Sequence, residues 1–133
     1  MDNTVRVWDV QTGECLATLK GHTSLVGLLG LSPKYLVSAA ADGTMRAWDS
    51  ETNKPIHVFA STGGAITCFQ HDDTKAVSGR DGKVELWDMN TGQCVRKFDG
   101  ISSVWQVAFN GDLLVVASNR GGSTVLDVFR FGQ

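Results

Sequence analysis

A Trp-Asp pair recurs along the chain at an almost constant spacing. It occupies positions 8–9, 48–49 and 87–88, so its copies are 40 and 39 residues apart, and a further 39 residues leads to Leu126-Asp127. The unit from Gly21 to Asp49 contains a Gly-His pair, two short apolar runs, an Asp-Gly turn and a segment that ends at Trp-Asp. Such a repeat means that each unit is one supersecondary element, which buries its apolar face against its neighbours.

A period of about 40–45 residues with this layout is typical of the WD-repeat β-propeller, in which each repeat forms one four-stranded blade. The prediction is an all-β fold, a partial WD-repeat β-propeller of about three four-stranded antiparallel blades. A closed ring needs about four to eight blades, and 133 residues are too few for that. The chain is therefore expected to be part of a larger propeller or to assemble with other chains.

The repeat divides the chain into four predicted units. They are a half-blade at 1–20, a blade at 21–60, a blade at 61–99 and a three-stranded terminal blade at 100–133. Residues 2–9 match residues 42–49, so the chain opens at the third strand of a blade. We expect Met1 to mark a truncation or a gene-model start and the C-terminus to be native, since an outer strand from elsewhere commonly completes such a blade.

The first full unit predicts strands at 25–31, 35–40 and 44–49. Its first two apolar runs lack strict alternation, which predicts strands buried on both faces between neighbouring blades. In the last unit Leu126 stands at the period of the tryptophans and is expected to replace them.

Charge and cysteine content exclude several classes of function. A net charge of −2 argues against a general nucleic-acid or anionic-membrane binder, and no apolar run approaches the roughly 18 residues of a membrane span. Cys15, Cys68 and Cys94 form no metal-binding or disulfide pattern. The lone histidines His57 and His71 likewise lack a second ligand at a fixed spacing. We expect reduced cysteines, no metal, no cofactor, and a location in the nucleus and cytoplasm.

Ser38, His22 and Asp42 have the residue types of a nucleophile, a base and an orienting carboxylate. The WD-repeat resemblance implies another role, a buried hydrogen-bond chain that runs from Asp42 through His22 to Ser38 and the Trp48 indole. An unpaired buried polar group costs about 1–3 kcal/mol, so such a chain specifies blade geometry. The structural role is favoured, and no enzymatic activity is predicted.

Arg80, Trp105 and Arg120 are the candidate binding residues of one propeller face. Arg80 comes immediately before a hairpin aspartate, where a guanidinium can bind a carboxylate or phosphate bidentately. A solvated surface charge is the alternative for Arg80, and simple packing near the central channel is the alternative for Trp105.

Two segments resemble a narrower family. His22–Leu29 followed by Leu36–Gly43, and the ending Val116-Ala117-Ser118 through Leu126–Phe129, are similar to the C-terminal propeller of F-box/WD-repeat proteins of the fungal cell-division-control type. These are substrate receptors of Skp–cullin–F-box ubiquitin ligases, and the resemblance covers essentially the whole chain. No F-box is visible in the sequence, so a link to a Skp-type adaptor and a cullin is implied through a missing F-box only.

The resemblance implies a phosphorylated degron bound by arginines at two kinds of position. The first kind corresponds here to Gly27, Thr67 and Trp105, and the second to Ala41 and Arg80. Arg80 alone retains an arginine, so this segment is expected to form the flank of a phosphopeptide pocket. The shorter hairpin before Asp81 leaves the alignment of Arg80 open by one residue.

The leading hypothesis is a non-enzymatic module that recognises phosphorylated protein substrates for ubiquitin transfer. The alternative is a general WD-repeat scaffold of another complex without a preference for phosphate. In both cases a partial propeller exposes apolar blade faces, which predicts self-association unless a partner covers them.

Overall fold

The computed structural model describes residues 3–60, 65–80, 82–101, 103–110 and 112–130, and within these ranges the chain contains thirteen β-strands and no helix. The strands are β1 Val5–Trp8, β2 Cys15–Leu19, β3 Val26–Leu31, β4 Tyr35–Ala40, β5 Thr44–Asp49, β6 Pro55–Ala60, β7 Cys68–His71, β8 Lys75–Arg80, β9 Gly82–Asp88, β10 Cys94–Ile101, β11 Val104–Asn110, β12 Leu113–Arg120 and β13 Ser123–Arg130. Residues 61–64 and Asp81, which the sequence places in loops, lie outside the described residues.

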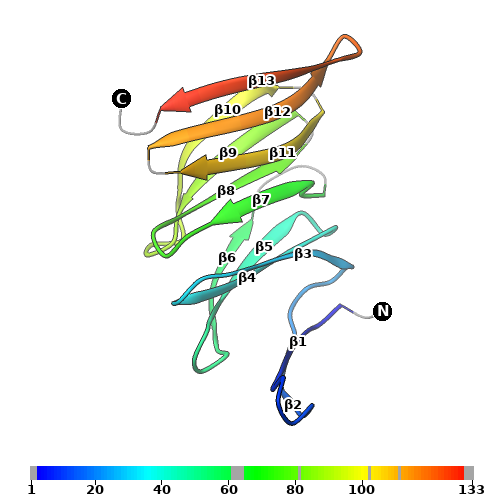
Figure 1. Ribbon diagram of the computed structural model, residues 1–133, viewed down its shortest axis with the longest axis vertical. Helices are drawn as coiled ribbons and strands as arrows, with labels where there is room; N and C mark the ends of the chain where they lie inside the picture. The colour runs from blue at the N-terminus through cyan, green and yellow to red at the C-terminus, as the bar shows by residue number, and fades with distance from the viewer. Residues whose placement is uncertain (1–2, 61–64, 81, 102, 111, 131–133) are drawn as a thin grey trace.

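The strands form four antiparallel sheets that follow one another along the long axis of the molecule (Figure 1). We call them the half-blade (β1–β2), the first blade (β3–β6), the second blade (β7–β10) and the third blade (β11–β13). In each, consecutive strands are neighbours, as expected for a propeller meander. The predicted all-β partial propeller is confirmed, and the strand predicted at 44–49 has those bounds.

Each blade has a leading face, toward the preceding sheet, and a trailing face, toward the following one. Between the first and second blades the buried residues are Tyr35, Val37, Ala39, Met45, Ala47, Phe59, Ile66, Ala76, Trp87 and Met89. Between the second and third blades they include Val77, Val84, Val107, Leu114 and Val116. Alternating side chains of one strand thus enter two different interfaces, because successive residues point to opposite faces.

The innermost strands of neighbouring blades approach closely. A Cβ built on Gly30 of β3 would lie 2.7 Å from His71 Cδ2 and 3.0 Å from Phe69 Cε2, both on β7. Only a residue without a side chain allows this approach. Gly30 therefore marks the inner contact between the trailing face of the first blade and the leading face of the second.

The predicted burial of strand 25–31 on both faces is wrong. In β3, Leu29 and Leu31 are 60% and 75% exposed, whereas β4 is buried as predicted. The half-blade explains the difference, because its two strands are the outer pair of a blade. They pack Val5 and Leu19 over Trp48, which is 3% exposed, and leave β3 uncovered.

The prediction that Leu126 takes the place of the repeat tryptophan is also wrong. Leu126 is 64% exposed and pairs with Ala117, on the trailing face of the third blade. Phe129 pairs with Leu114, as Trp87 pairs with Ala76, and so holds the tryptophan position. Its ring lies 4.6 Å from that of Phe98, an arrangement that repeats the Phe59–Trp87 contact at 5.4 Å between the first two blades.

The three cysteines are free, with Cys68 buried and Cys15 exposed at the start of β2. Among the described residues no helix could cross a membrane, and no group of three or more potential metal ligands comes together.

Candidate functional site

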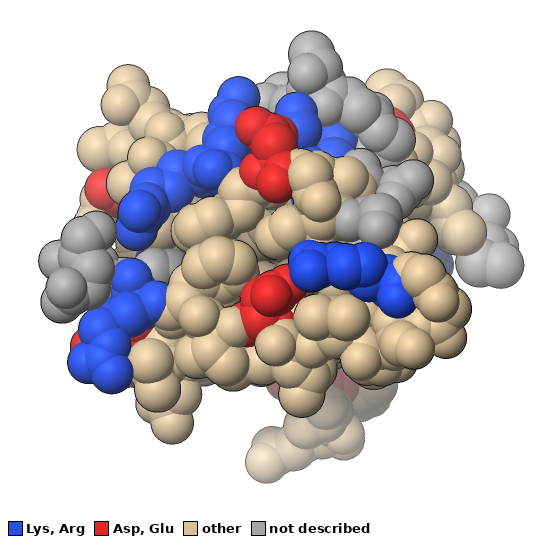
Figure 2. Space-filling model, turned by 90° about the horizontal axis from the view of Figure 1, so that it is seen from above, with Lys and Arg blue, Asp and Glu red and all other residues tan. Residues whose placement is uncertain are grey.

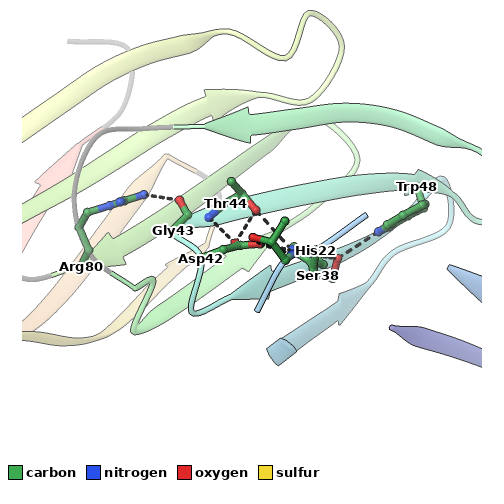
Figure 3. A network of polar contacts seen from close by, with 8 residues as sticks. His22, Ser38, Asp42, Gly43, Thr44, Trp48 and Arg80 are labelled. Atoms are coloured by element: carbon green, nitrogen blue, oxygen red, sulfur yellow. Dashed lines mark hydrogen bonds and ion pairs between the residues drawn. The ribbon is translucent and has the colours of Figure 1, made fainter. Parts of the chain in front are cut away.

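The structure places His22, Ser38, Asp42 and Trp48 in one chain of polar contacts in the first blade (Figure 3). The Trp48 indole Nε1 donates to Ser38 Oγ at 3.0 Å, and Ser38 Oγ lies 2.7 Å from His22 Nε2. His22 Nδ1 is 3.3 Å from Asp42 Oδ2. These polar contacts therefore join the hairpin turn to the middle of the blade.

Asp42 is the anchor of this chain at the β4–β5 turn. Its carboxylate accepts hydrogen bonds from the Thr44 amide at 2.9 Å, the Thr44 hydroxyl at 2.6 Å and the Thr23 amide at 2.9 Å. The turn and the entry to β3 are thereby held together by one side chain, since Thr23 precedes β3 and Thr44 begins β5.

Burial decides between the structural and the catalytic reading of these residues. Ser38 is 0% exposed and its oxygen is already bonded to His22 and Trp48, so no substrate carbonyl can reach it in this structure. A nucleophile needs access to the reacting atom. The hydrogen-bonded residues can therefore stabilise the geometry of the blade, but Ser38 cannot attack a substrate.

The ionisation of the network follows from the same geometry. Burial lowers the pKa of His22 below 6.5, although the neighbouring Asp42 opposes the shift. Burial alone would raise the pKa of Asp42, but hydrogen bonds from Thr44, Thr23 and His22 outweigh it, so that pKa lies well below 3.8. A neutral imidazole beside a carboxylate is the stable state at neutral pH.

Acid should weaken the fold through His22. Because the pKa of His22 is lower in the folded protein than in the unfolded chain, the unfolded chain binds protons more readily. The stability that neutral His22 contributes above about pH 6.5 is therefore lost as pH falls. Asp42, whose pKa is also lowered by folding, adds a second loss of stability that begins below about pH 3.8. Chemical denaturation between pH 7 and 4.5 should therefore show a falling free energy of unfolding.

The matched variants are His22→Gln and His57→Gln. The first should give a shallower slope of unfolding free energy against pH than the wild-type protein, and the second should keep the wild-type slope, since His57 lies outside the network. Parallel slopes for His22→Gln and the wild-type protein would contradict the assignment.

The second blade keeps only part of this network. Trp87 Nε1 donates to Ser78 Oγ at 3.0 Å, as Trp48 does to Ser38. The buried polar groups next to Ser78 are Arg80 and Glu85, which are 2% and 1% exposed. The second blade thus carries an ion pair where its neighbour carries a histidine network.

Arg80 points into the space between the first two blades (Figure 3). Its Nε lies 3.4 Å from Glu85 Oε1, and its Nη2 donates to the Gly43 carbonyl of the neighbouring hairpin at 3.2 Å. The guanidinium therefore offers almost no surface to a ligand. A phosphate contact at Arg80 would require the side chain to leave Glu85, and burial of the arginine is a feature that the sequence pattern did not indicate.

Trp105 and Arg120 lie at one end of the third blade. Trp105 is 53% exposed, and the side chain of Arg120 is 57% exposed. The two strands that carry them are joined at this end, where Val104 pairs with Ser118 and the Asn119 amide donates to the Ser103 carbonyl at 3.2 Å. Arg120 Nη2 contacts Asp127 Oδ2 at 3.4 Å. Of the three predicted binding residues, these two are exposed to solvent and Arg80 is not.

Comparison with known families identifies the repeat. The family described as WD domain, G-beta repeat matches residues 13–49 and 53–88. The chain is 38% identical to Regulator of rDNA transcription protein 13 of Saccharomyces cerevisiae, over 98% of the chain and 83% of that protein.

The chain is also similar to a longer relative and to a designed protein. Over its whole length the chain is 35% identical to Cell division control protein 4 of Saccharomyces cerevisiae, of which it spans 20%. The crystal structure of the computationally designed Ika4 protein superposes with a TM-score of 0.89 at 32% identity, covering 98% of this chain and 81% of that one.

Proposed function

Because the chain belongs to the WD-repeat family, a family of protein-interaction modules, we propose that it forms part of a substrate receptor that binds phosphorylated segments of proteins. Ubiquitin transfer would be carried out by partner proteins recruited elsewhere in such a receptor. The role of this chain is to position the substrate and not to transform it.

The observation that carries the proposal is the match to Cell division control protein 4, which extends over the whole chain at 35% identity. It agrees with the sequence resemblance to F-box/WD-repeat receptors. The same resemblance implies that the bound segment carries phosphate.

Trp105 and Arg120, both exposed at the same end of the third blade, give this surface a suitable chemistry. An aromatic ring can pack against an extended peptide and a guanidinium can attract a phosphate, and charge-assisted hydrogen bonds are worth about 1.5–3 kcal/mol. Arg120 is the group that a phosphate would reach first, because its side chain is 57% exposed. Arg80 is buried between the first two blades, where it contacts Glu85 and the Gly43 carbonyl.

The test is the affinity of the protein for matched phosphorylated and unphosphorylated peptides from a degenerate serine/threonine library. We expect the phosphorylated pool to bind more tightly, with an affinity that falls as salt rises. Arg120→Glu should remove that preference, while Lys54→Glu, in a turn of the first blade, should preserve it. Equal binding of both pools by the wild-type protein would contradict the proposal.

A second candidate is a general WD-repeat scaffold without a phosphate preference. The burial of Arg80 against Glu85 favours it, since the arginine position that the receptor resemblance singles out is occupied by an internal ion pair. The match to Regulator of rDNA transcription protein 13 shows that related chains are not confined to one type of protein. In this reading the peptide library gives binding that is independent of phosphorylation.

A further inference from the structure

The tip of the β12–β13 hairpin projects from one end of the third blade (Figure 1). Arg120 pairs with Ser123 across the tip, and Gly121 and Gly122 between them have φ angles of 61° and 84°. Positive φ at both central residues of a two-residue loop is the pattern of a type I′ turn. The Asn119 side chain closes the loop by accepting from the Gly122 amide at 3.1 Å. The turn therefore holds Arg120 and Ser123 directly opposite each other.

The side chains of Arg120 and Ser123 leave the same face of the sheet, because directly paired residues of antiparallel strands do so, with Cβ atoms about 5 Å apart. The guanidinium now contacts Asp127, since Arg120 Nη2 lies 3.4 Å from Asp127 Oδ2. Asp127 is four residues further along β13 and pairs with Val116. An anion on Ser123 is therefore nearer to Arg120 in register than its present partner is.

The same residues have the spacing that basophilic protein kinases select, a basic side chain three residues before the hydroxyl. Arg120-Gly121-Gly122-Ser123 has this spacing. All residues from 119 to 124 are exposed, so opening the tip to enter a kinase active site uncovers no buried side chain. Exposed loop tips are the places where enzymes reach a folded chain most easily.

Two other hydroxyls share the spacing but are already engaged. They are Thr23, three residues after Lys20, and Ser78, three residues after Lys75. Ser78 is 2% exposed and accepts the tryptophan hydrogen bond of the second blade. The Thr23 hydroxyl donates to Asp42 at 3.3 Å, in the polar network of the first blade. The exposed hairpin tip is therefore the more accessible place for phosphorylation.

We propose that Ser123 is a phosphorylation site of a basophilic protein kinase and that its phosphate takes Arg120 away from Asp127. In the transfer, Ser123 Oγ attacks the γ-phosphorus of ATP, the bond to ADP breaks, and the hydroxyl proton passes to the catalytic aspartate of the kinase. The product carries a charge of about −1.5 to −2 and three strong acceptor oxygens. It is thus a stronger partner for a guanidinium than a single carboxylate.

The modification regulates the surface to which we assign phosphopeptide binding, and this part of the inference rests on the proposed function. A phosphate in the same hairpin is an intramolecular partner with a high effective concentration. Seen from the end where the third blade lies, basic side chains lie next to acidic ones (Figure 2). An incoming peptide phosphate already competes with Asp127 for Arg120, and phosphorylated Ser123 is the stronger competitor.

Labelling of the 133-residue chain with radioactive ATP and a kinase selective for arginine at this spacing tests the site. We expect about one phosphate per chain, mapped to Ser123 by mass spectrometry and lost in Ser123→Ala. Arg120→Gln should slow labelling about tenfold or more, because the kinase loses a charge-assisted contact. Thr124→Ala removes the adjacent hydroxyl, which has glycine at that spacing, and should be labelled like the wild-type chain. Labelling at Thr23 instead, or no labelling of the folded chain, would overturn the proposal.

Phosphorus NMR of a chain synthesised with phosphoserine at position 123 tests the contact with Arg120 without any peptide. A guanidinium beside the phosphate favours the dianion, so its second pKa should fall below the ordinary value of about 6. The same phosphorylated chain with Arg120→Gln should titrate at the ordinary value. Equal titration midpoints of the two chains would show that the phosphate does not bind Arg120.

Peptide binding tests the regulation. Phosphoserine at position 123 should lower the affinity for the phosphorylated peptide pool about tenfold or more, since the charge-assisted contact to Arg120 is lost. Ser123→Ala should bind both pools like the wild-type chain. Equal binding of both pools by the unmodified chain contradicts the proposed function, whereas a preference for phosphate that survives phosphorylation of Ser123 contradicts the regulation alone.

Discussion

An Arg80→Met variant should lose about 3–5 kcal/mol of stability, because it leaves a buried carboxylate without its cation. The Arg80 and Glu85 side chains are 3% and 1% exposed, and the two Glu85 oxygens accept no hydrogen bond from the residues that the structure describes. The contact to Arg80 Nε at 3.4 Å is therefore the main compensation for burying the charge. The variant also loses the bond to the Gly43 carbonyl, which joins the second blade to the first.

The double variant Arg80→Met/Glu85→Leu is the matched control. Replacing both charges by apolar groups of similar size is often close to neutral, so the double variant should recover most of the loss. Urea denaturation of Arg80→Met, Glu85→Leu, the double variant and the wild-type protein measures the coupling. If Arg80→Met were as stable as the wild-type protein, Arg80 would be a surface charge, as one reading of the sequence had it.

This result would also separate two roles of Arg80. Replacing a phosphate-binding arginine lowers the affinity for the peptide and leaves the free energy of unfolding nearly unchanged. Breaking a buried ion pair lowers the free energy of unfolding and leaves the affinity nearly unchanged. Measuring both quantities for Arg80→Met and Arg120→Glu shows which arginine binds the peptide.

The sequence predicted the blades because repetition is visible in the residues themselves. Trp48 and Trp87 lie at equivalent strand positions, and each donates its indole N–H to a serine of the neighbouring strand. The period, the Asp-Gly turns and the β-branched runs all agree on strands of a propeller, and agreement between local and global signals is typical of a well-specified fold.

The parts that the sequence could not predict depend on register and on neighbours. Phe129, 42 residues after Trp87, holds the tryptophan position because the third-blade hairpin extends to Arg120–Ser123, which shifts the strand against the period. The aromatic side chain of Phe129 was the feature of the sequence that could have identified this position. Leu31 is exposed because the half-blade beside it has only two strands, β1 and β2. The ion pair of Arg80 depends on Glu85, which lies on the paired strand β9.

The His22 network yields the second large effect. Ser38→Ala removes the oxygen that is bonded to both His22 Nε2, at 2.7 Å, and Trp48 Nε1, at 3.0 Å. Each buried polar group left unpaired costs about 1–3 kcal/mol, and two groups lose their partner together. The expected destabilisation is therefore at the upper end of what one hydroxyl can cause.

Ser78→Ala is the matched comparison, since Ser78 is equally buried and bonds Trp87 Nε1 at the same 3.0 Å distance but no histidine. It should cost about 1–3 kcal/mol, for one unpaired donor. The difference between the two variants isolates the histidine contact, and Ser38→Ala introduced into the His22→Ala variant should cost no more than Ser78→Ala costs in the wild-type protein. Equal losses for Ser38→Ala and Ser78→Ala would mean that the His22 contact adds nothing to the stability of the first blade. The repeat would then be held by the tryptophan–serine bond and apolar packing alone.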